Sequence, residues 1–225
     1  MELTLPEELL LLSRNEQSGR LAAGEAVSFG VAGAVLMELA LDGRIGVRDN
    51  RLVALDGGSG ALAVRQAGPA AEELWKRIRE QRRPRRAARW VGSARNDKAY
   101  QKVRTGLRDR GIVHAERHRV LGLFPATRWT EADPVPGVEI RDRVARAVSG
   151  GDADERTVAL VLLVDASELS TRVFPRIDRR TRKDRLRKFA AGPWASEPVG
   201  EAVRAVTKGV TGALSSARAA QAANN

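Results

Sequence analysis

The chain has 225 residues, no cysteine and a net charge of +11. Without cysteine it has no disulfides, thiolate metal sites or cysteine nucleophiles, so packing alone must stabilise the fold. A positive charge of this size favours an anionic partner, either a nucleic acid or an acidic membrane surface. The length and the 43% hydrophobic content are typical of one folded domain with a sizeable core.

The first predicted helix begins near Thr4. In the segment Thr4-Leu5-Pro6-Glu7-Glu8, proline occupies the first turn and two acids lie near the positive end of the helix dipole. The following run from Leu9 to Leu12 would be buried. The acidic start and this short apolar run do not resemble a signal peptide, so we expect a cytoplasmic protein.

The most apolar stretch runs from Glu25 to Arg44 and predicts a helix with almost no polar face. Such a helix is either a membrane span or the centre of a core. Glu38 ends the uncharged run before it reaches the roughly 18 to 20 residues that a bilayer requires, so we expect a buried central helix. Glycines 30 and 33 would allow another helix to approach closely, and Asp42-Gly43 would end this one.

The next part of the chain alternates between turns and polar helices. Residues 44–55 predict a hairpin around Asp49-Asn50, and glycines 57 to 60 predict a flexible connection. Helices are expected over Pro69–Gln81 and Lys98–Arg110. The arginine-rich stretch from Lys76 to Arg89 has two interpretations, a solvated helix face or an anion-binding ridge.

A second hairpin is expected within residues 112–134. Its predicted strands are Ile112-Val113 and Val120 to Phe124, joined through the polar residues 116–119 and ending at Pro125. On a strand, His114, Glu116 and His118 would share one face and could bind a metal ion. We interpret them instead as the polar part of the hairpin and expect no metal site.

The C-terminal part predicts further helices. These cover Val138–Val148, an apolar helix containing residues 158–164 and capped by Asp152 or Asp154, a strongly basic helical segment from Ser170 to Gly192, and Pro198–Leu214. Residues 215–225 are expected to be a disordered tail. The predicted fold class is mainly α: residues 1–214 form one multi-helix domain around a buried central helix, with small β-hairpins. Because no catalytic or nucleotide-binding motif is present, we expect neither enzymatic activity nor a cofactor.

Four segments resemble, in order, the Golgi phosphoprotein 3 (GPP34) family and its bacterial relatives. They are LTLPEELLLL from Leu3, GVAGAVLMELALDGRI from Gly30, GIVHAERHRVLGLFPATRW from Gly111 and, more weakly, VALVLLVDASEL from Val158. The resemblance implies a helical domain with a protruding hairpin and peripheral membrane binding through phosphatidylinositol 4-phosphate. It also implies self-association through the hairpin and binding of protein tails. The eukaryotic Golgi role does not carry over to a bacterial member.

In the family, a Trp and three Arg hold the lipid headgroup, and they align with Ala23, Ala32, Asp97 and Tyr100. Because this chain does not have the family's residues at these positions, the sequence does not identify which lipid headgroup it binds. Neighbouring and hairpin cations are the candidate lipid-binding residues: Arg95, Lys98, Lys102, Arg104, Arg117, Arg119 and Arg128. The candidates for membrane insertion are Val120, Leu121, Leu123, Phe124 and Trp129. Apolar side chains beside arginines can enter the headgroup region while the cations meet anionic lipid; the alternative is that they pack on the body or on a second subunit.

Three functions remain open at this point. The first is a peripheral membrane protein that binds anionic lipid, which sedimentation with vesicles tests. The second, less favoured, is a winged-helix-like nucleic-acid-binding protein, in which a gel shift with steep salt dependence is expected. The third is an adaptor or scaffold for protein tails, or a homo-oligomer formed through the hairpin, which cross-linking with and without residues 116–127 tests.

Overall fold

A computed structural model describes residues 2–15, 18, 20–55, 68–120, 124–192 and 197–224, with the backbone alone at 118–120 and 124–126. The protein is mainly α, as expected. Its elements are α1 (Leu5–Leu12), α2 (Glu25–Leu41), β1 (Ile45–Arg48), β2 (Arg51–Ala54), α4 (Gly68–Glu80), α5 (Ala87–Asn96), α6 (Ala99–Asp109), β3 (Val113–Val120), β4 (Phe124–Glu131), α7 (Val135–Val148), α8 (Glu155–Ala166), α9 (Ser170–Val173), α10 (Arg179–Ala191) and α11 (Pro198–Ala223).

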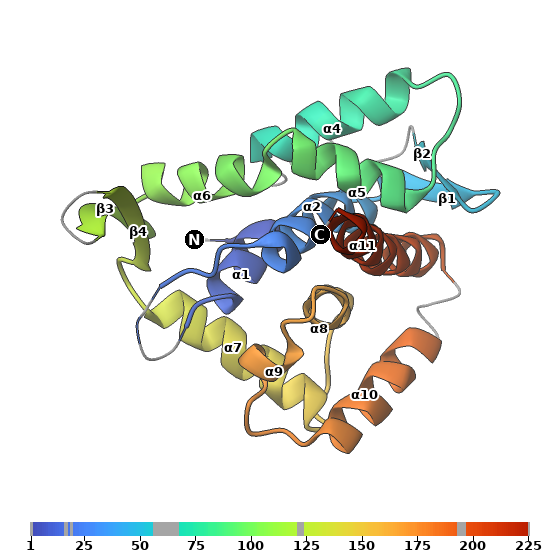
Figure 1. Ribbon diagram of the computed structural model, residues 1–225. Coiled ribbons are helices and arrows are strands. Elements are labelled where there is room, and N and C mark those ends of the chain that lie inside the picture. Colours follow the sequence, from blue (N-terminus) through green and yellow to red (C-terminus); the bar gives the residue numbers. More distant parts are fainter. Residues whose placement is uncertain are drawn as a thin grey trace.

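Helix α2 is the centre of the fold, which confirms the expected buried central helix (Figure 1). Every residue from Phe29 to Ala40 is buried, and α1, α5, α8 and α11 all pack against it. Its glycines permit these close contacts, because a Cβ on Gly30 would overlap Ser167 and a Cβ on Gly33 would overlap Val210. The helix ends as predicted at Asp42, followed by Gly43 with a φ of 67°.

The other helices form two groups on either side of α2. Helices α4, α5 and α6 lie along one side, and α7, α9 and α10 lie on the other side beyond α8 (Figure 1). One hydrophobic core runs through all of them and includes Leu9, Trp90, Leu107, Val144 and Leu163. The layer of α4, α5 and α6 therefore packs on α2, and a β-hairpin lies at each end of the molecule.

The two hairpins lie at opposite ends of the molecule (Figure 1). The first pairs β1 with β2 and turns at Asp49 and Asn50, whose φ values of 52° and 58° are those of a tight hairpin turn. The second pairs β3 with β4 over the full length of both strands, from Val113 opposite Glu131 to Val120 opposite Phe124. The second hairpin extends from the end of α6.

The strands of the second hairpin are longer than the sequence suggested. Residues 116–119 are part of β3 rather than the turn, and Pro125 is inside β4, opposite Arg119. A two-stranded ribbon can expose polar side chains along its length, and its open edges tolerate proline. The polar run was therefore a poor marker of the turn.

The expected single basic helix over residues 170–192 is instead two helices. Helix α9 ends at Val173, and α10 begins at Arg179. The break coincides with Pro175, because a residue preceding proline is disfavoured in the α conformation. Phe174, at this position, is buried in the core, and Asp178 caps α10 by accepting from the backbone N–H groups of Arg180 and Thr181.

The disordered tail expected at residues 215–225 is also corrected, because α11 continues to Ala223. Leu214 is buried, and Arg218 Nη2 donates to Glu168 Oε2 over 2.6 Å. The alanines that suggested low complexity are strong helix formers, and the Arg218–Glu168 pair adds a contact between this part of α11 and the body.

Candidate functional site

The acids of the family-like signature hold the core together. Glu38, buried on α2, accepts hydrogen bonds from the backbone N–H of Leu5 and, over 2.8 Å, from Arg156 Nη1. Glu8 pairs with Arg143 at 2.7 Å, and burial raises the pKa of Glu8 against the opposing effect of its arginine neighbours. These contacts join α1, α2, α7 and α8.

The remaining signature residues are structural in the same way. Glu7 accepts from the backbone N–H of Thr4 over 2.9 Å and from Arg110 over 2.7 Å. At the other end of α2, Arg44 pairs with Glu72 at 2.9 Å and lies over the ring of Trp75. These four charged residues of the family-like motifs, Glu7, Glu8, Glu38 and Arg44, therefore stabilise the fold, and each already has an internal partner.

The predicted lipid-binding residues near α6 mostly contact the protein itself. Arg95 pairs with Glu25 at 3.1 Å and lies over the ring of Phe29. Arg104 lies over the ring of Trp129, with its Cζ carbon 4.1 Å from the ring centre. Lys98, which has left-handed backbone angles at the start of α6, is exposed.

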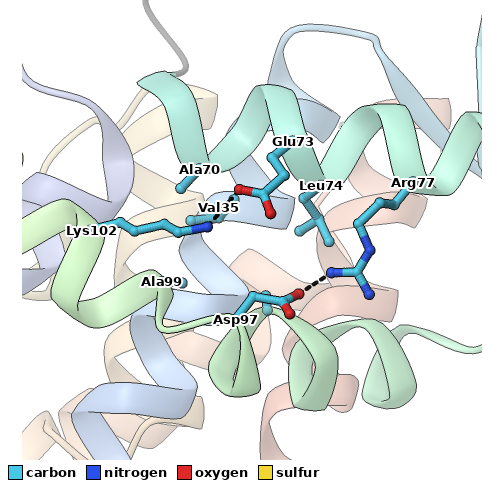
Figure 2. A pocket seen from close by; sticks show the side chains of 9 residues that line it. Val35, Ala70, Glu73, Leu74, Arg77, Asp97, Ala99 and Lys102 are labelled. Atoms are coloured by element: carbon cyan, nitrogen blue, oxygen red, sulfur yellow. Dashed lines mark hydrogen bonds and ion pairs between the residues drawn. The ribbon is translucent and has the colours of Figure 1, made fainter.

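Lys102 belongs to a small hollow between α4 and the α5–α6 turn (Figure 2). Its amine pairs with Glu73, and on the other side Arg77 pairs with Asp97 and donates to Ser93. The hollow encloses only about 10 Å³, which is room for one water molecule. It is a gap between packed helices that two ion pairs close, and it does not fit a lipid headgroup.

The residues that the resemblance aligns with the family's headgroup positions have other roles in this structure. Tyr100 is buried and donates from its hydroxyl to the carbonyl oxygen of Ala22 over 3.0 Å. Ala32 is fully buried, and Asp97 is the partner of Arg77. None of these three side chains is available as a cation for a phosphate.

The second hairpin divides the remaining predicted residues between its two faces. Arg128 is directly opposite Glu116, whereas Arg117 is on the other face, the one that carries Trp129. Both arginines are exposed, and neither forms an ion pair with another described residue. Trp129 is half-buried beneath Arg104 and packs against the core.

The other hairpin residues that we predicted fall outside this description. Leu121 and Leu123 lie outside the described residues. The backbone of Arg119, Val120 and Phe124 is described, but their side chains are not.

The first turn of α7, at the base of this hairpin, carries two exposed apolar residues that the sequence analysis missed. Val135 is 54% exposed and Val138 is 43% exposed. The buried face of α7 instead contains Ile140 and Val144. The sequence did contain a sign of this exposure, because the apolar residues of α7 fall on two different faces of the helix.

Glu131 fixes the hairpin base to the body. Its carboxylate lies 3.1 Å from Arg14 Nε, and a Cβ on Gly137 of α7 would overlap it. Burial raises the pKa of Glu131 to about 7, opposed by Arg14 and Arg141 and reinforced by Asp133. The side chain is thus close to its ionisation point at neutral pH.

Within the described ranges, no three His, Asp or Glu side chains lie close enough together to hold a metal ion. Every helix in those ranges is too short or too polar to cross a bilayer.

The family model described as Golgi phosphoprotein 3 (GPP34) matches residues 5–206, which is most of the chain. No curated protein matches the sequence. The family match includes every element from α1 to the first part of α11.

Proposed function

Because the chain belongs to the Golgi phosphoprotein 3 (GPP34) family, we propose that it is a non-catalytic peripheral membrane protein that binds anionic phospholipid. The observation that carries this proposal is the end of the molecule formed by β3, β4 and the start of α7. Exposed apolar side chains occur there together with cations that form no ion pair with another described residue. We propose that this hairpin end is the surface that meets the membrane.

The residues at the hairpin end have complementary roles in this proposal. Val135 and Val138 would enter the headgroup region, together with the predicted apolar tip of the hairpin. Arg117 and Arg128 project from opposite faces of the ribbon and would flank the inserted part on both sides. Each cation near an anionic surface contributes about 1 kcal/mol of binding free energy, which salt screens.

Recognition of the lipid would depend on charge rather than on a fitted headgroup pocket. The positions that hold the headgroup in the family are occupied by Ala32, Tyr100 and the Asp97–Arg77 pair. We therefore expect phosphatidylinositol 4-phosphate to bind no more tightly than other lipids at equal surface charge. This expectation separates the chain from relatives that have the pocket.

Vesicle sedimentation tests the proposal. The protein should bind vesicles of phosphatidylcholine with phosphatidylglycerol at low salt, and not vesicles of phosphatidylcholine alone. Removing two cations with Arg117→Ala and Arg128→Ala should weaken binding about tenfold to thirtyfold. Val135→Ser with Val138→Ser should weaken it at every salt concentration, because their contribution is apolar.

A matched control is Arg176→Ala with Lys183→Ala, two exposed cations remote in sequence from the hairpin. This control should bind vesicles almost as the wild type does. If both cation pairs weaken binding equally, the hairpin end is not the docking surface. If the wild type fails to bind at low salt and instead forms cross-linked dimers that depend on residues 116–127, the hairpin is a self-association surface.

A further inference from the structure

The end of the molecule opposite the hairpin of β3 and β4 carries an open hollow lined by arginines. Its lining comes from the start of β2, the connection between α4 and α5, and the first turn of α5. We call its five arginines the arginine corner: Arg51, Arg83, Arg85, Arg86 and Arg89. The other lining residues are Gln81 and Pro84, and the hollow measures about 480 Å³.

The backbone beneath the arginine corner is firmly held. The backbone N–H of Leu52 donates to the carbonyl oxygen of Arg85 over 2.9 Å, and Arg51 Nη1 donates to the carbonyl oxygen of Pro84 over 2.9 Å. Ala87 is packed so closely on α11 that a Cβ on Gly209 would lie 2.9 Å from its backbone. The guanidinium groups are therefore presented from a fixed base, which limits the entropy lost on binding.

No acidic side chain in the described part of the chain pairs with the arginine corner. Among its described lining residues none is acidic, and none of its five arginines forms an ion pair with another described residue. Arg48, exposed on β1, is directly opposite Arg51 and adds a further cation. Like charges placed together repel, so an anion bound among them would relieve repulsion as well as add contacts.

The chemistry of these groups identifies the class of ligand. Guanidinium is planar and presents a fork of N–H donors that matches two oxygens of a phosphate. The uncapped start of α5 follows Arg86 and adds its positive dipole end to the same side. Arg51 donates one N–H to Pro84 and Arg85 lies over the ring of Trp90, but each guanidinium has further N–H donors. The five groups together offer more donors than one phosphate can engage, so the ligand should carry at least two phosphates.

We infer that the arginine corner binds a small soluble ligand with two or more phosphate groups. The inference that the arginine corner binds phosphate groups does not depend on the proposed function. The inference that the ligand is soluble rather than a lipid headgroup does rest on the proposed function, because the corner and the hairpin end lie at opposite ends of the molecule (Figure 1). When the hairpin end meets a bilayer, the corner faces the solvent.

Calorimetric titration of the full chain with inorganic pyrophosphate tests the inference. Pyrophosphate should bind saturably and at least tenfold more tightly than inorganic monophosphate. Arg83→Gln with Arg89→Gln should weaken pyrophosphate binding at least tenfold without lowering the melting temperature of the ligand-free protein, because neither side chain has an internal partner among the described residues. The matched control, Arg176→Gln with Lys183→Gln, removes the same charge from the region of α10 and should change the affinity less than threefold.

Other outcomes would overturn the inference. Equal weakening by the control pair would show a response to net charge alone. A duplex DNA gel shift that R83Q/R89Q abolishes, without saturable pyrophosphate binding, would make the corner a nucleic-acid contact. Vesicle binding that R83Q/R89Q reduces as much as R117A/R128A would place the corner against the bilayer. If the wild type binds no vesicles, the lipid proposal fails alone, and the pyrophosphate titration still decides the phosphate site.

Discussion

Two groups of arginines in this chain have opposite surroundings. Around α1 and α2, Arg110, Arg143 and Arg156 each contact a buried or nearly buried glutamate of the family-like signature. In the arginine corner, five arginines share one hollow without an acidic neighbour among its described lining residues. The net charge of +11 alone does not distinguish these groups. The positions of the acids determine which cations stabilise the fold and which remain available to an external anion.

The largest effect is expected where the paired group is broken. Glu38→Ala removes the nearer counter-ion of Arg156 and the acceptor for the backbone N–H of Leu5. Arg156 keeps Glu8 at 3.8 Å and the carbonyl oxygen of Leu3. Breaking a buried ion pair costs about 3 to 5 kcal/mol of unfolding free energy, and the remaining contacts of Arg156 place the expected loss at the lower end of that range. Urea denaturation followed by circular dichroism measures this loss.

The matched control for that variant is Glu139→Ala, which removes an exposed carboxylate from α7 and should change stability by less than about 0.5 kcal/mol. A loss below about 1 kcal/mol for Glu38→Ala would show that the signature acids do not stabilise the centre. The distinction between arginines that stabilise the fold and the arginines of the arginine corner would then be lost.

The second effect concerns pH and the base of the β3–β4 hairpin. The folded protein raises the pKa of Glu131 from 4.5 to about 7 by burial, so it holds this proton more tightly than the unfolded chain does. This contribution to stability is fully present below about pH 4.5 and is lost as the pH rises through about 7. A shift of this size corresponds to up to about 3 kcal/mol.

Glu131→Gln cannot ionise and should remove this part of the pH dependence. Between pH 5 and pH 8, the wild type should lose up to about 3 kcal/mol more unfolding free energy than the variant. Burial also raises the pKa of Asp42 to about 6 and raises the pKa of Glu8. Because both proteins keep these two groups, their contributions to the pH dependence cancel in the comparison. Parallel stability curves over this range would contradict the assignment.

The sequence predicted the buried centre well because its signals are local. The apolar run of α2, its glycines and the Asp49-Asn50 turn all appear in contiguous residues. Helix α5 was missed although Ala87, Trp90, Val91 and Ala94 have helical spacing, because the surrounding arginines obscured that pattern. Local pattern was therefore sufficient for apolar elements and insufficient for this highly charged one.

The candidate sites were less predictable because they depend on residues far apart in the chain. The sequence gives no sign that Lys102 pairs with Glu73, or that Arg95 pairs with Glu25. The basic stretch ending at Arg89 was recognised, with an anion-binding ridge as one interpretation. What was missing was Arg51, which the first hairpin brings to the same hollow. Whether a cation is free depends on tertiary contacts that spacing does not show.

A third, smaller effect measures how tightly the centre is packed. Gly33→Ala places a methyl group against Val210 and 3.2 Å from Leu163 Cδ1, so the close approach of α11 and α8 must relax. Overpacking of this kind costs about 1 to 3 kcal/mol. Gly106→Ala on α6 is the matched control, because its Cβ would meet nothing within 4 Å. The control should gain up to about 1 kcal/mol from helix propensity. Equal effects of the two substitutions on thermal unfolding would contradict the described packing.

The smallest effect is expected in the unpaired group and has the opposite sign. Arg48→Ala removes one of two like charges that face each other across β1 and β2. Because such a pair repels, the variant should be more stable than the wild type by about 0.2 to 1 kcal/mol at low salt. In about 1 M NaCl, where the screening length is about 3 Å, this gain should vanish. Arg176→Ala, an exposed cation outside the corner, should show neither the gain nor its salt dependence. A loss of stability in Arg48→Ala at low salt would mean that Arg48 and Arg51 do not repel each other, and the argument that a bound anion relieves repulsion at this edge of the arginine corner would fall with it.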